Sequence, residues 1–188
     1  MNPADATTRH HRVAAWRGAA GAGLRAAAIG LAALGLAYVG SLSLALAPWT
    51  AMALPGGLAI AAAWRWGRPV LAGVAAGVFV AMLGLGLSWP AAALAPLVLV
   101  PAALAAHALL QWASFDARLD RASDVAALAL ATLVAAAFPA ALAMAVWITM
   151  TQGGSALASL ATGWITLGLG MLLAAVTVLA FDRSVLHA

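Results

Sequence analysis

One histidine lies inside an otherwise uncharged apolar stretch of the sequence. His107 stands near the end of a run that contains no Lys, Arg, Asp or Glu. A titratable group within a membrane segment is a candidate functional residue, because its burial has to be compensated. We expect His107 either to respond to pH or to form an ordinary hydrogen bond to a neighbouring helix.

A Pro-Gly-Gly triplet interrupts the second apolar run of the chain. It consists of Pro55, Gly56 and Gly57. Proline removes a backbone donor and glycine loosens a helix, so backbone carbonyls and amides would become free at membrane depth. Because broken helices at that depth often line binding sites, we expect a ligand site beside the triplet. The alternative is a kink that only shapes the bundle.

A short charged segment holds three of the carboxylates. Asp116, Asp120 and Asp124 are spaced by four residues, which would place them on one face of a helix. Interleaved arginines offset their charge, so we expect no metal there and predict a cytoplasmic connection that contacts a partner. The candidate partner-contact residues are Phe115, Asp116, Arg118, Asp120, Arg121 and Asp124. The alternative is a solvated loop in which Ser123 or Asp124 caps the next helix.

Common enzyme motifs are missing from the sequence. It contains no His-Glu-x-x-His, no Gly-x-Ser-x-Gly and no phosphate-binding glycine loop that ends in lysine. It also contains no cysteine, which excludes disulfides, thiolate nucleophiles and Cys-ligated metals. We therefore expect no enzymatic activity, no cofactor and no metal.

Long apolar segments must position these residues. Only 7% of the chain is charged, whereas soluble domains carry about 25%. Six windows approach the length of about 20 residues that a membrane-spanning helix requires: residues 26–47, 48–64, 69–88, 90–112, 125–150 and 155–181. The sequence predicts an all-α, polytopic membrane helix bundle of about six transmembrane helices. The expected divisions are a basic cytoplasmic segment (residues 1–25), a transmembrane domain (26–181) and a short cytoplasmic tail (182–188).

The arginines indicate the orientation of the bundle. With six spans and the N-terminus inside, all nine Arg lie in the cytoplasm, and the three opposite connections carry no charge. This arrangement follows the positive-inside rule, so we expect both termini on the cytoplasmic side of a bacterial inner membrane. The short second window would be re-entrant only if Arg65 and Arg68 lay on the uncharged side.

Small and aromatic residues suggest how the spans pack and where they end. Gly73 and Gly77, with Gly84 two turns on, are predicted to form a helix-packing face of the third window. Tryptophans at the predicted span ends are expected to anchor the bundle at the headgroup level. They are Trp49, Trp64, Trp66, Trp89 and Trp112.

Five stretches of the chain combine a Pro-Gly turn, a basic connection with tryptophan, and glycine-rich helices. They are residues 54–59 (LPGGLA), 64–69 (WRWGRP), 73–77 (GVAAG), 115–125 (FDARLDRASDV) and 164–172 (WITLGLGML). Together they resemble the first class of bacterial membrane-associated sensor domain, over roughly residues 48–181. The chain departs from that family at Thr166 and Leu167, where the family has Gly-Asp, and at Val176, where it has proline.

The resemblance implies a sensory input module. Such domains normally precede a histidine kinase or a diguanylate cyclase, so a partner of that kind is implied in the cytoplasm. This chain carries neither motif, so we expect either the separated sensor part of such a protein or a stand-alone relative that acts through partners. Trp164, in the stretch similar to the family's last helix, joins Pro55, Gly56, Gly57 and His107 as a candidate ligand-binding residue.

We therefore expect an integral membrane sensory or regulatory module of a bacterial signal-transduction system. It would contact membrane lipid and a cytoplasmic output partner, and no nucleic acid. The alternative is a small substrate-binding or transport subunit of a membrane importer, which a broken second helix would suit. A structural or assembly protein without a ligand is the third possibility.

Overall fold

The computed structural model describes the backbone of residues 3–42, 49–116, 121–153 and 155–186. It describes the side chains of residues 21–42, 51–116, 121–150, 153 and 155–180. Within these ranges every regular element is helical. The elements are α1 (Pro3–Leu42), α2 (Trp49–Trp66), the 3₁₀ turn η1 (Arg68–Val70), α3 (Leu71–Gly84), α4 (Trp89–Trp112), α5 (Ala122–Leu130), the π-helical segment η2 (Ala131–Ala137), α6 (Phe138–Gln152) and α7 (Ala156–Leu186).

Four helical stretches are long and apolar enough to cross a membrane. They are Gly21–Leu42, Trp89–Trp112, Ala122–Met150 and Ala156–Ala180. Large apolar side chains on them are exposed, for example those of Leu97, Leu142 and Leu173, and lipid accepts such surfaces. The chain is therefore a helical membrane protein, and the predicted all-α membrane bundle is confirmed to that extent.

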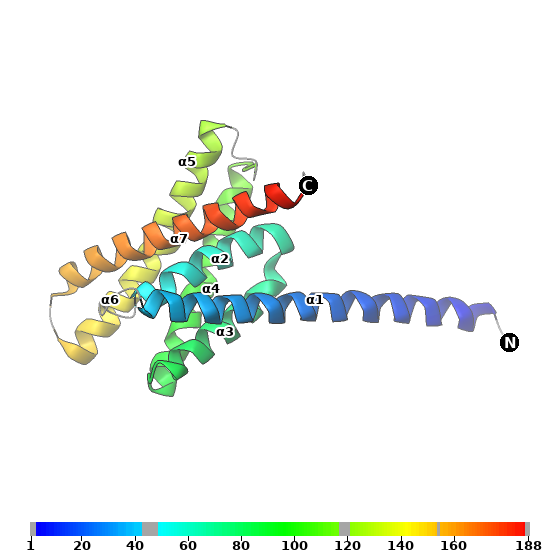
Figure 1. The fold of residues 1–188 in the computed structure, drawn as a ribbon, viewed down its shortest axis with the longest axis horizontal. Coiled ribbons are helices and arrows are strands. Elements are labelled where there is room, and N and C mark those ends of the chain that lie inside the picture. The colour runs from blue at the N-terminus through cyan, green and yellow to red at the C-terminus, as the bar shows by residue number, and fades with distance from the viewer. Residues whose placement is uncertain (1–2, 43–48, 117–120, 154, 187–188) are drawn as a thin grey trace.

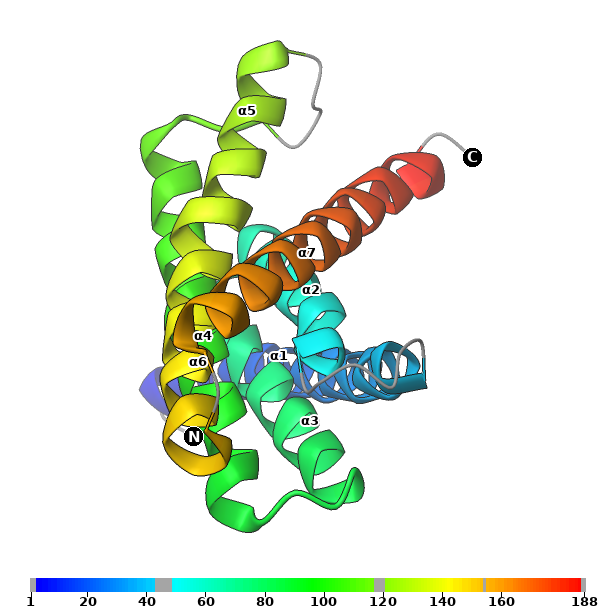
Figure 2. The same cartoon turned by 90° about the vertical axis from the view of Figure 1, so that its left-hand side faces the viewer.

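Helix α2 lies at the centre of the bundle. Between residues 51 and 63 every side chain except that of Leu54 is buried. The helix packs most extensively on α7 and also contacts α1, α3 and α4, and it lies between α1 and α7 in both views (Figures 1 and 2). Because its neighbours are protein, it can be built largely from Ala and Gly, which permit close helix approach.

The break expected at the Pro-Gly-Gly triplet is absent. Helix α2 runs without interruption through Pro55. A Cβ on Gly56 would lie 2.5 Å from Met171 Cε, and one on Gly57 would lie 2.6 Å from Ala174 Cβ. Because they lack a side chain, the two glycines allow α7 to pack closely against α2. Packing from the neighbouring helices keeps Pro55 within a continuous helix.

The glycine face of α3 packs against α1. The backbones of Gly73 and Gly77 lie directly against those of Ala26 and Gly30, and a Cβ on Gly30 would be 2.7 Å from the Gly73 carbonyl oxygen. Gly84 lies beneath a side chain of α1 further along. Helix α1 is 40 residues long and begins well before the first apolar window, so its N-terminal part projects from the bundle (Figure 1).

Candidate functional site

Four residues singled out by the sequence gather where α2, α4 and α5 end or begin. The Trp64 ring centroid lies 5.9 Å from that of His107, with the ring planes at 64°. It lies 5.2 Å from that of Phe115, with the planes at 80°. Both contacts have the edge-to-face geometry that aromatic rings prefer. With Asp124, which is linked to Phe115 through its neighbour Asp116, these residues are named the Trp64 cluster.

Trp64 differs from the other tryptophans predicted to be anchors. Trp89 and Trp112 are 73% and 83% exposed at the two ends of α4, whereas Trp64 packs against the apolar core. The side chain of Trp49 lies outside the described residues. Sequence reasoning assigned Trp64 only to the membrane interface, and nothing in its local spacing separated it from Trp66, two residues further on.

A helix C-cap directs Phe115 into the bundle. Ser114 has φ +52°, and the Phe115 N–H donates to the Leu110 carbonyl at 3.1 Å while the Ser114 N–H donates to Gln111 at 3.2 Å. This pair of bonds around a left-handed residue is a Schellman motif, which normally brings an apolar residue after the turn back onto the helix. Phe115 is accordingly buried, although its neighbours Ser114 and Asp116 are exposed.

Asp124 closes the connection between α4 and α5. It is only 6% exposed, and its Oδ1 accepts a hydrogen bond of 3.4 Å from the Asp116 N–H. The N-cap of α5 is Arg121, which makes no capping hydrogen bond through its side chain. The expectation that Ser123 or Asp124 caps this helix is therefore wrong, because Asp124 reaches back to the preceding connection.

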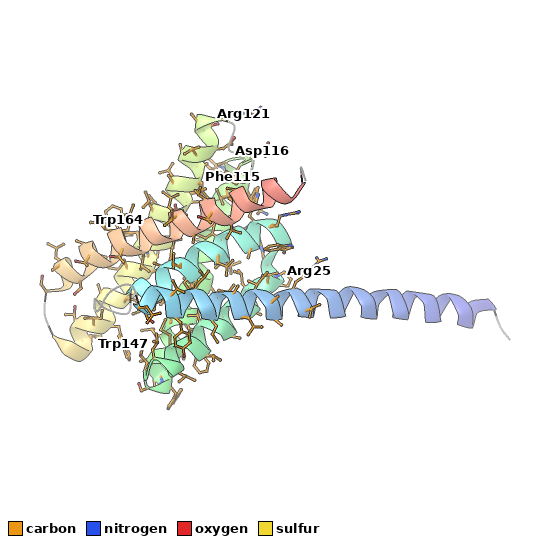
Figure 3. The ribbon with its side chains drawn as sticks, viewed as in Figure 1. Arg25, Phe115, Asp116, Arg121, Trp147 and Trp164 are labelled. Atoms are coloured by element: carbon orange, nitrogen blue, oxygen red, sulfur yellow. The ribbon has the colours of Figure 1, made fainter. Side chains whose placement is uncertain are left out.

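Asp116 and Asp124 do not share a helical face. Helix α4 ends at Trp112 and α5 begins only at Ala122, and Asp116 lies in non-helical backbone between them. Because the tight turn at Ser114 ends α4 before Asp116, the four-residue spacing does not place Asp116 on the face of a helix. Arg118 and Asp120 lie outside the described residues. Arg121 is exposed at the same end of the molecule as Asp116 (Figure 3).

Two polar atoms of the Trp64 cluster are buried without a hydrogen bond. Within the described part of the chain, His107 Nδ1 and Asp124 Oδ2 have no hydrogen-bond partner. Leaving such a group unpaired costs about 1–3 kcal/mol, and native structures rarely do so. The cluster therefore has unused capacity to bind a proton or a polar group. Among the described residues, no three His, Asp or Glu side chains gather as metal ligands would.

Trp164 makes a polar contact with residues outside the Trp64 cluster. Its indole N–H donates to the Leu133 carbonyl at 2.7 Å, and its ring lies 5.9 Å from that of Phe138 at 85°. Leu133 belongs to the seven-residue π-helical segment η2, where the usual helical hydrogen bonds are displaced. The sequence did not predict this segment. The one available signal was Pro139, which lacks an N–H and disturbs the preceding turn.

The candidate ligand residues thus fall into three places. His107 lies in the Trp64 cluster, Trp164 binds η2, and Gly56 and Gly57 are packed against α7. Comparison of the chain with protein-family models, with curated proteins and with solved structures finds no match. The resemblance to a sensor domain stays a prediction, and a functional assignment rests on the geometry of the cluster.

Proposed function

We propose that this chain is an integral membrane sensory or regulatory module of a bacterial inner membrane, which passes a signal to a cytoplasmic partner of the histidine kinase or diguanylate cyclase type. The observation that supports it is the Trp64 cluster. A buried histidine of a long apolar helix is in ring contact with Trp64, and Trp64 is in ring contact with Phe115. A change at His107 would reach the α4–α5 connection through two direct contacts.

The cluster is also mechanically linked to α7. Trp64 belongs to α2, whose Gly57 packs directly on the α7 backbone. A displacement of α2 must therefore be shared with α7, because packed helices shift as units rather than deform. The C-terminal end of α7 lies on the same side of the molecule as the α4–α5 connection (Figure 1). A partner on that side could read both elements.

Six spans with both termini in the cytoplasm fit this arrangement. In addition to the four long helices, α2 has 18 residues, about 27 Å at 1.5 Å per residue, and Arg68–Gly84 forms a shorter apolar helix. Arg25 and Arg121 lie toward the side on which α7 ends (Figure 3). The positive-inside rule would place that side in the cytoplasm.

The importer alternative depended on a broken second helix with free backbone groups. Helix α2 is continuous, and the space beside Gly56 and Gly57 is filled by Met171 and Ala174. A ligand could enter there only if α2 and α7 separated. No feature of the described residues favours transport over signalling.

Site-specific photo-crosslinking in cells tests the proposed partner. A photoreactive phenylalanine analogue replaces Ser123, which is exposed on the first turn of α5. The matched control carries the analogue at Ser88, which is exposed in the connection between α3 and α4. We expect an adduct with a kinase or cyclase at position 123 and none at position 88, identified by mass spectrometry.

The outcome of this experiment separates the functional classes. An adduct with an ATPase subunit at position 123 would contradict the signalling assignment and make the chain part of a transporter. Equal adducts at both positions, or none at position 123, would refute a specific partner contact at this connection. A second arm replaces His107 with Ala, and the proposal requires that the activity of the captured enzyme changes.

A further inference from the structure

The helix that begins at Ala122 and ends at Gln152 changes its form in the middle. Helix α5 leads into the π-helical segment η2, which leads into α6 without a loop (Figure 2). A π helix closes its hydrogen bonds five residues apart, and such segments are rare and short. Because each of its turns takes more residues, η2 holds about one residue more than an α helix of equal rotation would. An α-helical form of the same residues would therefore rotate α5 relative to α6.

Helix α7 holds both the centre and the end of η2. The Trp164 indole N–H donates to the Leu133 carbonyl at 2.7 Å, and a Cβ on Gly168 would lie 2.5 Å from Leu133 Cδ2. Trp164 and Gly168 are one helical turn apart, so the backbone and the side chain of Leu133 lie against the same face of α7. The Trp164 ring also contacts that of Phe138, the first residue of α6. An α-helical form would turn the Leu133 carbonyl away from Trp164, and lipid offers no water to replace the lost bond.

Helix α5 is the half of this long helix that the bundle holds less firmly. Helix α6 packs extensively on α7, whereas α5 packs mainly on its own continuation η2 and only slightly on α4. Between residues 125 and 137 the only polar side chain is that of Thr132. Its hydroxyl donates to the carbonyl oxygens of Leu128 at 2.7 Å and Ala129 at 3.1 Å, within the same helix. Rotation of this segment would therefore not bury an unpaired polar side chain.

Rotation of α5 would change the α4–α5 connection through Asp124. This side chain is buried, and its Oδ1 accepts a hydrogen bond from the Asp116 N–H. One residue of α helix corresponds to a rotation of about 100°, which would carry the carboxylate away from Asp116. We infer that η2 is a switch between a π-helical and an α-helical form, and that Trp164 holds it in the π-helical form. The inference concerns the chain alone and does not depend on the proposed partner.

Distances between two spin labels on the purified full-length chain test the switch. The chain contains no cysteine, so two introduced cysteines are the only labelled sites. The first pair joins Ser123 of α5 to Thr177 of α7, and the control pair joins Val146 of α6 to Thr177; all three residues are exposed. A rotation of about 100° moves a group on a helix of about 5–6 Å radius by about 8 Å. The switch therefore changes the first distance by several ångströms and leaves the second unchanged.

Two substitutions of Trp164 remove its contacts in steps. Trp164→Phe keeps a ring beside Phe138 but loses the N–H, and Trp164→Ala loses both. Loss of one hydrogen bond shifts an equilibrium by about tenfold. We therefore expect a second distance population for the first label pair in Trp164→Phe and a larger one in Trp164→Ala. The matched control Trp89→Phe, at an exposed tryptophan of α4, should behave as wild type does.

The outcomes in the full-length chain decide the inference. An unchanged first distance in both Trp164 variants would overturn it. A shift of both distances would also overturn it, because α7 itself would then have moved. Deletion of Ala135 adds a second check, since η2 without its extra residue can form an α helix that keeps α5 and α6 in their present orientation. In this background Trp164→Phe should leave both distances unchanged, and a shift of the first one there would refute the role of the π-helical form.

Discussion

The α2–α7 contact provides a quantitative test of the packing. In Gly57→Ala the new Cβ would lie 2.6 Å from Ala174 Cβ and 2.9 Å from the Ala175 amide nitrogen, where ordinary contact is 3.4–4 Å. One further neighbour is the Met171 carbonyl oxygen, which belongs to the backbone and cannot rotate away. The helices must therefore move apart by about 1 Å. Overpacking of this kind costs about 1–3 kcal/mol, and we expect the upper end because backbone must shift.

Reversible unfolding in mixed detergent micelles measures this cost. SDS is titrated into the purified protein, and unfolding is followed by far-ultraviolet circular dichroism. The matched control is Gly35→Ala on α1, where a Cβ would meet nothing within 4 Å. The control should be neutral or stabilised by up to about 1 kcal/mol, since alanine has the higher helix propensity. If both variants changed the free energy of unfolding equally, the close α2–α7 approach would be refuted.

Three further variants test the turn at Ser114, the π-helical segment η2 and the Trp64 cluster, each by the same SDS titration. Ser114→Gly should stabilise by about 1 kcal/mol, because Ser114 is left-handed (φ +52°) and the matching position after α3 is already Gly86 (φ +84°); a loss of stability would contradict this. Trp164→Phe should destabilise by about 1–2 kcal/mol, since it removes the N–H bound to the Leu133 carbonyl, and an unchanged midpoint would argue against that bond. Trp64→Ala should cost about 3–5 kcal/mol by removing a packed aromatic side chain with two ring contacts, and a cost below 1 kcal/mol would mean that the cluster does not hold α2 and α4 together.

Long uncharged runs were the most reliable signal in the sequence. The window at residues 90–112 corresponds to α4, and the windows at 125–150 and 155–181 lie within the helical stretches Ala122–Gln152 and Ala156–Leu186, apart from residue 155. Hydropathy reports where lipid can surround a helix, and it does not report where the helix ends. Helix α1 therefore starts at Pro3, far before the apolar window, because arginines do not interrupt a helix.

Contacts between distant segments explain the errors. The intrinsic propensities of Pro55, Gly56 and Gly57 predicted a break in the helix. In the structure the two glycines instead pack against α7, and the helix continues. Asp124 was expected to be a cap because capping is a local rule, yet its partner is the backbone N–H of Asp116, which follows the turn at Ser114. The meeting of Trp64, His107 and Phe115 depends on three elements at once, so no local spacing could predict it.

The burial of α2 has a consequence for how the protein is made. Helix α2 emerges early in synthesis, but α7, its most extensive neighbour, is the last helix of the described chain. Until α7 is complete, the face that contains Gly56 and Gly57 has to be covered by lipid or by a chaperone. The tertiary structure is therefore complete only when α7 packs against α2. A chain truncated before Ala156 would leave this face of α2 uncovered, and quality-control proteases would recognise it.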